Sequence, residues 1–261
     1  MEDLYRQITA YIVERGRELK TAAGNISVVA KGKEIVTELD LSIERGLVAL
    51  IQKYAPTHSF LAEEEHSEHT AASDIWIIDP ISGTSIFADG APHYGISVAH
   101  EHRGTVNFSA VYDPSVDELW TAYRGKGIFL NGQPINTLRN DQSARRVLLN
   151  FTTVNYLLDG WREEIIRAFS KFNLFRTRYC FAVAYAQVAA GRFGAVVSFG
   201  KDVFTEYAGS LLITEAGGLF TTGRGEKRIT VRDRIFVGGF DPLYQEVFAV
   251  VENLRRSGID L

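Results

Sequence analysis

The segment IIDPISGTSIF, residues 77–87, contains the residue types of a site for phosphate and metal ions. The apolar run that leads into it predicts a buried strand that ends at Asp79 and exposes this carboxylate. Gly83 and Thr84 follow at the expected start of a helix, where backbone N–H groups bind phosphate. Between Asp79 and Gly83 lies Ser82, which has a neutral hydroxyl where a second acid would complete a metal site. The segment therefore predicts an anion site beside one strand-end acid.

Composition and charge exclude several classes of protein. Hydrophobic residues make up 46% of the 261 residues and charged residues 23%, which are ordinary values for a globular protein. The net charge of −4 gives no positive field, so we expect neither nucleic acid nor a membrane surface as a partner. The N-terminus has no signal core, and no run of about 18 apolar residues occurs. We therefore expect a cytoplasmic protein.

Apolar periodicity predicts helices and then strands in the first half of the chain. Two amphipathic helices are expected, over residues 1–19 and after the segment VTELD. Their apolar positions are Leu4, Ile8, Ile12, Leu41, Ile43, Leu47 and Ile51. Short β-rich stretches between residues 95 and 135 predict an antiparallel meander, and Asn131-Gly132 is typical of a type I′ hairpin turn.

Strands and helices alternate in the second half. Helices are expected over residues 160–172, 181–191 and 205–218, and the last helix should have Asp241 as its N-cap and Pro242 as its first residue. We therefore expect two lobes. The N-terminal α+β lobe should span residues 1–140 and the C-terminal α/β lobe residues 141–261, with the boundary in the polar stretch NTLRNDQSA.

Four segments carry a resemblance to a known family. They are EIVTELD (34–40), FLAEEE (60–65), WIIDPISGTSIFADGAP (76–92) and TEYAGSLLITEAGG (205–218). In their order and spacing the chain resembles the inositol monophosphatase family, a superfamily of magnesium-dependent, lithium-sensitive phosphomonoesterases. The resemblance covers nearly the whole chain. It implies an α+β fold with a layered αβαβα sandwich, a homodimer and no organic cofactor.

The resemblance also implies roles for individual residues. Glu63, Asp79 and the backbone carbonyl of Ile81 match the ligands of the first Mg²⁺ ion. Thr84 matches a threonine that orients the attacking water together with the metal-bound Glu63 and the first acid of EIVTELD, which is Glu34 here. Two or three clustered Mg²⁺ ions would neutralise the phosphoryl oxygens and activate this water. Gly83 and Thr84 would hold the phosphate.

The second metal position departs from the family pattern. Besides Asp79, the family uses two further aspartates, and their positions hold Ser82 and Thr205. A hydroxyl is a weak ligand for Mg²⁺, so we expect one metal ion at most. Glu206 lies one residue from Thr205, which on a helix turns its side chain by about 100°. We expect Ser82 and Thr205 to act as helix N-caps instead.

Two more family positions have changed, which leaves several functions open. Ser198 replaces an acid that contacts a substrate hydroxyl, and Ile86 replaces an asparagine. We expect a divergent member that binds a small phosphorylated or polyol-like metabolite, with weak, lost or altered chemistry. An active phosphatase is the alternative, in which Asp202, Glu206 or Asp89 would supply a ligand. An enzyme of another reaction class could also reuse the cleft, whereas a scaffolding role has no positive support in the sequence.

Other residue types that could do chemistry have simpler interpretations. His66 and His69 are expected in a charged surface loop rather than at a metal ion. Cys180 lies in an apolar segment and is expected to be buried and unreactive. The glycines of RGKGIFLNG lack the dinucleotide-binding spacing, and neither a Walker loop nor a GxSxG elbow occurs.

Overall fold

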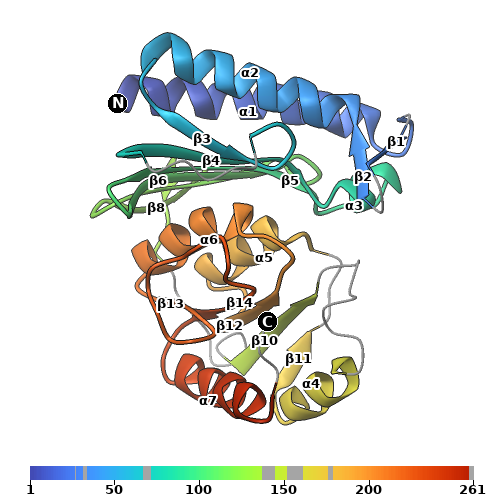
Figure 1. Cartoon of the computed structure of the whole chain (residues 1–261), viewed down its shortest axis with the longest axis vertical. Coiled ribbons are helices and arrows are strands. Elements are labelled where there is room, and N and C mark those ends of the chain that lie inside the picture. The colour runs from blue at the N-terminus through green and yellow to red at the C-terminus, as the bar shows by residue number, and fades with distance from the viewer. Residues whose placement is uncertain are drawn as a thin grey trace.

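Five layers of helices and sheets make up the chain (Figure 1). The computed structural model describes residues 1–26, 28–31, 34–66, 72–136, 145–151, 161–175 and 179–258. The layers follow the order helices, sheet, helices, sheet, helices, so the predicted αβαβα sandwich is confirmed. No helix in the described part of the chain is both long enough and apolar enough to span a bilayer.

The first layer consists of α1 (Glu2–Ala22) and α2 (Glu38–Tyr54). Six of the seven predicted apolar positions are buried, namely Leu4, Ile8, Ile12, Ile43, Leu47 and Ile51, whereas Leu41 is only partly buried. Before α2 lies a hairpin of β1 (Val28–Lys31) and β2 (Glu34–Thr37). Thr37 is the N-cap of α2, and its hydroxyl accepts a bond from the backbone N–H of Asp40.

The second layer is a seven-stranded sheet in the order β3-β4-β5-β6-β7-β8-β9. Its strands are β3 (Ser59–Ala62), β4 (Asp74–Ser82), β5 (Gly95–His102), β6 (Thr105–Asp113), β7 (Glu118–Tyr123), β8 (Gly127–Leu130) and β9 (Gln133–Pro134). Only β3 and β4 run parallel, so the predicted meander is confirmed from β4 onward. Asn131 and Gly132 join β8 to β9 with φ angles of 49° and 76°, as a type I′ turn requires.

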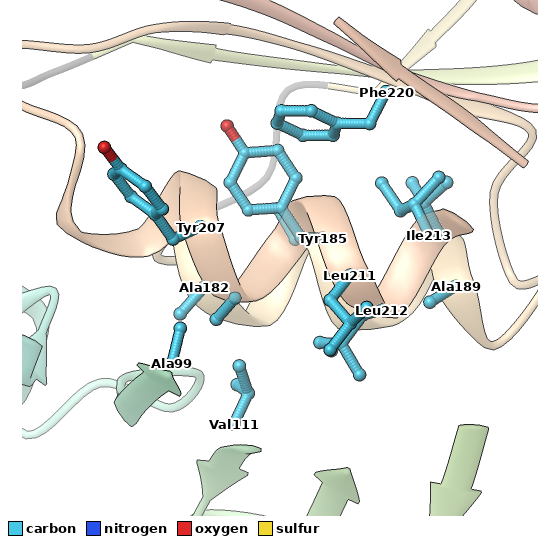
Figure 2. Close-up of a cluster of buried hydrophobic side chains, with 14 of the residues drawn as sticks. Ala99, Val111, Ala182, Tyr185, Ala189, Tyr207, Leu211, Leu212, Ile213 and Phe220 are labelled. Carbon is cyan, nitrogen blue, oxygen red and sulfur yellow. The ribbon is translucent and has the colours of Figure 1, made fainter. Parts of the chain in front are cut away.

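The third layer, α5 (Phe181–Ala189) and α6 (Phe204–Glu215), lies between the two sheets. In Figure 2, Leu212 points toward the strand that carries Val111, whereas Tyr185 lies on the opposite side beside Phe220. The Tyr185 and Phe220 rings meet edge-on with centroids 5.5 Å apart. One apolar core thus joins residues of both sheets through these two helices.

The fourth layer is a five-stranded sheet in the order β11-β10-β12-β14-β13. Its strands are β10 (Arg146–Phe151), β11 (Asn173–Phe175), β12 (Ala195–Phe199), β13 (Leu219–Thr222) and β14 (Ile235–Gly239). The outermost helices, α4 (Arg162–Phe169) and α7 (Leu243–Arg256), cover its far face (Figure 1). The expected lobe boundary near residue 140 lies outside the described residues.

One helix start differs from the sequence prediction. Asp241 was expected to cap α7, with Pro242 as the first helical residue, but Pro242 is the N-cap and the helix begins at Leu243. The first intrahelical bond confirms this, because the N–H of Glu246 donates to the carbonyl of Pro242 at 3.3 Å. The prediction was wrong by one residue, since Pro242 has no N–H and its fixed φ suits either position.

Candidate metal and phosphate site

The chain turns sharply where β4 ends. The pairing of β4 with β5 shifts register between Asp79 and Ser82, and extended backbone continues to Ser82. Gly83 then has a φ of +81° and serves as the N-cap of the short helix α3 (Thr84–Ala88). A Cβ atom at Gly83 would lie 2.8 Å from the Cβ of Cys180, so only glycine fits. The prediction that Ser82 caps this helix is therefore wrong, because the turn falls one residue later.

Thr84 contacts an acid that the sequence reasoning did not single out. Its hydroxyl lies 3.3 Å from Oδ1 of Asp40 and 3.0 Å from the carbonyl oxygen of Ile81. Asp40 is fully buried and also accepts a 2.7 Å bond from the backbone N–H of Thr37. Burial raises the pKa of Asp40, and the bonds from Thr37 and Thr84 oppose that shift.

The T-x-x-D spacing of Thr37 and Asp40 is a capping-box pattern. This pattern in the sequence indicates a structural role for Asp40. Glu34, the acid that was selected instead, lies at the start of β2, and its side chain is outside the described part of the structure. Its role beside Thr84 remains a prediction.

The buried acid Asp79 lies beside the partly buried acid Glu63. Asp79 is 5% exposed, and its Oδ1 has no hydrogen-bond partner among the described residues. Burial raises the pKa of Asp79 well above its usual range, and the nearby carboxylates of Glu63 and Asp202 raise it further. A carboxylate in this setting either keeps its proton or binds a cation.

Lys201 supplies a cation at this position. It follows β12, and its Nζ lies 3.1 Å from Oε1 of Glu63 and 3.6 Å from Oδ2 of Asp202. Burial raises the pKa of Glu63, and the positive charge of Lys201 opposes the shift. No local pattern pointed to Lys201, because Glu63 lies 138 residues away in the sequence.

Thr205 and Glu206 are bound to each other inside the fold. Helix α6 begins at Phe204 with Val203 as its N-cap, so the prediction that Thr205 caps the helix is wrong. As a residue of the first helical turn, Thr205 donates its hydroxyl to Oε2 of Glu206 at 3.0 Å. Tyr185 donates to Oε1 of Glu206, also at 3.0 Å. Burial raises the pKa of Glu206 to about 8, and the Asp202 charge adds to the shift.

The remaining family positions lack acids as well. Ser198 is fully buried in β12 and faces Tyr185. Ile86 lies on α3 and packs against the apolar cores on both faces of the seven-stranded sheet.

Asp89 is exposed at the C-cap of α3. Cys180 is buried as expected, accepts a bond from the Val183 N–H, and burial raises the pKa of its thiol to about 12.

The residues present fit one Mg²⁺ ion but not two. Glu63, Asp79 and the carbonyl of Ile81 supply oxygen ligands of the kind that Mg²⁺ prefers, and the unpartnered Oδ1 of Asp79 is suited to a cation. When bound, such an ion would neutralise phosphoryl oxygens and activate water. At the second position, the hydroxyls of Ser82 and Thr205 stand where the family adds two carboxylates to that of Asp79. At the first position, Lys201 would compete with a metal ion for Glu63.

Another group of metal-binding residue types lies at the start of β4. His58, Asp74 and His100 bring one ligand atom each within 4.8 Å of one another, which makes a possible metal-binding triad among the described residues. The two imidazole rings stack with centroids 5.4 Å apart and planes 9° apart. Face-to-face stacking keeps the in-plane lone pairs of the two rings in separate planes, which disfavours shared coordination of one ion.

The tautomer of His58 also disfavours metal binding in this triad. Trp76 donates its indole N–H to Nδ1 of His58 at 3.1 Å, which leaves the ring proton on Nε2. His100 bonds to Oδ1 of Asp74 at 3.2 Å and His102 bonds to the same oxygen at 2.7 Å, so this oxygen already has two imidazole partners. His66 bonds to Glu44, and His69 lies outside the described residues.

Comparisons with known proteins agree with the fold and the motifs. The model of the inositol monophosphatase family matches residues 2–255, so the chain belongs to this family. Nus factor SuhB of Pseudomonas aeruginosa is 32% identical over 232 residues, which are 82% of each chain. Inositol-1-monophosphatase of Rhizobium meliloti is 34% identical over 210 residues, 77% of each chain. The solved structure of a Thermotoga maritima IMPase superposes with a TM-score of 0.84, at 29% identity and over 100% of both chains.

Proposed function

We propose that this protein is a divergent inositol monophosphatase family member that binds a small phosphorylated or polyol-like metabolite and hydrolyses phosphate monoesters weakly or not at all. The observation that carries this proposal is the ion pair between Lys201 and Glu63. A lysine of the chain itself holds the acid that would anchor the first Mg²⁺ ion. Ser82 and Thr205 leave the second ion without carboxylates.

Electrostatics support weak metal binding. Two unit charges at 4 Å interact with about 4 kcal/mol at an effective dielectric of 20. The loss of two carboxylates and the presence of one ammonium group therefore both weaken the binding of a dication. The family's chemistry depends on charge neutralisation at the phosphoryl group, so the rate should fall with the loss of the metal ions.

Phosphate binding is supported by the parts of the site that remain. The proposal is supported by the Gly83 turn at the start of α3 and by the Thr84 hydroxyl, which lies 3.3 Å from the buried Asp40. Ser198 and Ile86 leave the surroundings less acidic than in the family pattern. A bound molecule with few positive groups suits this setting.

The direct test is phosphate release from inositol and sugar phosphates with Mg²⁺ or Mn²⁺, beside calorimetry with the same ions. We expect turnover far below the usual enzyme range and at most one metal ion per chain. Turnover above ~1 s⁻¹, which is ordinary for enzymes, would refute the proposal. The Thermotoga maritima IMPase is the positive control.

An active phosphatase with a rearranged site is the second candidate. It is favoured by Asp202, whose charge raises the pKa of Asp79 and whose carboxylate lies 3.6 Å from Lys201. This candidate requires that alanine at Asp202, Glu206 or Asp89 abolish metal-dependent hydrolysis and leave the fold intact. Loss of activity in none of these three variants would reject it. A cytoplasmic location, a homodimer and the lack of a nucleic-acid partner remain predictions.

A further inference from the structure

A basic cavity opens at the end of the second sheet opposite to the candidate site. Its volume is about 400 Å³, and it is lined by Arg145, Arg146, Lys171, Phe172, Leu243 and Glu246, among others. Arg146 begins β10 and pairs with Asn173 at the start of the parallel strand β11. Lys201 follows the opposite end of β12, which runs parallel to β10. At about 3.3 Å per residue, the two ends of this five-residue strand lie roughly 17 Å apart. The cavity is therefore separate from Glu63 and Asp79.

The cavity concentrates positive charge in an acidic protein. Arg145, Arg146 and Lys171 face one carboxylate, that of Glu246, whereas the whole chain carries a net charge of −4. Within the described part of the chain, none of these three cations forms an ion pair. Arg146 stacks over the Phe175 ring at 5.5 Å, and its Nε is buried with no partner among the described residues. Buried donors of this kind are normally satisfied by a partner.

The geometry suits a phosphate group. A guanidinium presents a planar fork of donors that matches phosphate oxygens, and lysine adds a point charge. The 14-residue helix α7 begins at the cavity with Leu243, and the positive end of its dipole favours an anion there. The volume lies in the range of pockets for small molecules, which is about 300–1,000 Å³.

Glu246 narrows the class of ligand. Its carboxylate would repel a polyanion, but it accepts hydrogen bonds from hydroxyl groups. Phe172 and Leu243 add apolar wall. We infer that this cavity is a second binding site, for a hydroxyl-bearing phosphate monoester of sugar-phosphate size, with the phosphate on Arg145, Arg146 and Lys171 and a hydroxyl on Glu246. This inference does not depend on the proposed function.

The test is calorimetry of the full chain with glucose 6-phosphate in the presence of a chelator, which removes binding through divalent ions. We expect binding that weakens at least tenfold in Arg145→Gln and in Lys171→Gln, both of which change exposed side chains and should fold normally. Lys227→Gln, another exposed lysine outside the cavity, is the matched control and should bind like the parent. In a Thr84→Ala background, which removes a contact of the candidate site, Arg145→Gln and Lys171→Gln should still weaken binding by the same factor.

Inorganic phosphate distinguishes the hydroxyl contact from simple charge attraction. Glu246→Gln should strengthen the binding of inorganic phosphate, because a repulsive charge is removed. The affinity for glucose 6-phosphate should stay the same or decrease. The inference is overturned if the parent shows no binding of glucose 6-phosphate at 10 mM, roughly the weakest useful affinity. It is equally overturned if Arg145→Gln and Lys171→Gln bind like the parent, or if Thr84→Ala abolishes binding.

Discussion

The hydroxyl of Thr84 and the buried carboxylate of Asp40 lie 3.3 Å apart and connect two motifs that are 44 residues apart in the sequence. Asp40 belongs to the first turn of α2 and completes the capping box with Thr37. Thr84 opens α3 directly after the turn at Gly83. One carboxylate thus both completes the N-terminal cap of α2 and contacts the first residue of α3, where the anion is expected.

Replacing Asp40 with alanine should destabilise the fold. The change removes the capping box and leaves the Thr37 and Thr84 donors without their acceptor, which together should cost about 2–3 kcal/mol of unfolding free energy. Urea denaturation at neutral pH measures this loss. Asp3→Ala, which removes an exposed acid from α1, is the control and should change stability by no more than about 0.5 kcal/mol. Equal stability of the two variants would contradict the structural role of Asp40.

Replacing Lys201 with methionine should increase the affinity for Mn²⁺. Methionine keeps the length of the side chain and removes the charge that competes with a cation for Glu63. We expect at least a tenfold lower dissociation constant, since removal of one opposing charge is worth more than about 1.4 kcal/mol here. Calorimetric titration measures the constant. Lys227→Met changes an exposed lysine and should bind like the parent, and the same result for Lys201→Met would disprove the competition.

Restoring both missing acids should restore metal-dependent hydrolysis. The double variant Ser82→Asp with Thr205→Asp supplies the carboxylates of the second ion, and we expect Mg²⁺-dependent phosphate release at least tenfold above the parent. The control is Ser82→Asn with Thr205→Asn, which has nearly the same shape without charge. If both double variants release phosphate at the parental rate, other changes disabled the site, for instance those at Ser198 and Ile86.

The stability of the protein should fall as the pH decreases from about 6.5 to about 4. Burial lowers the pKa of His100 to about 4, and the charge of His58 adds to this, whereas Asp74 opposes it. In this window the unfolded chain binds a proton that the folded chain does not, so acid favours unfolding, by up to about 3 kcal/mol. Urea denaturation of the parent at several pH values measures the slope.

His100→Phe isolates the contribution of this group. Phenylalanine keeps a ring beside Tyr5 and Trp76, which both contact His100. The pH slope of the variant should be smaller than that of the parent between pH 6.5 and 4. His102→Gln, a change at the half-exposed neighbour, should retain the parental slope. Identical slopes for His100→Phe and the parent would assign the pH dependence to other groups.

The sequence predicted the layers better than the contacts between them. The spacing of Leu4, Ile8 and Ile12 defines a helix face, and Asn131-Gly132 defines a turn, because both patterns act over a few residues. Helix starts were displaced by one residue at Ser82 and Pro242, where neighbouring residues suit the cap almost equally well.

The site residues divide in the same way. Glu63 and Asp79 followed from motif resemblance, and the structure places the partly buried Glu63 beside the buried Asp79. Lys201 and the burial of Glu206 against Tyr185 did not follow, because these contacts exist only after α5, α6 and the two sheets have packed. No pattern within one segment contains that information.

Ser82 ends a strand of the first sheet and Thr205 lies in the first turn of a helix between the sheets, so the second ion of a metal-bearing relative would bridge two layers of the sandwich. In a relative with acids at the positions of Ser82 and Thr205, the two carboxylates repel each other across that junction until divalent ions bind. In this chain the two hydroxyls add no repulsion to that between Asp79 and Asp202, and Lys201 lies 3.6 Å from Asp202. Its layers should therefore stay docked in a chelating buffer, with a melting temperature that EDTA does not change.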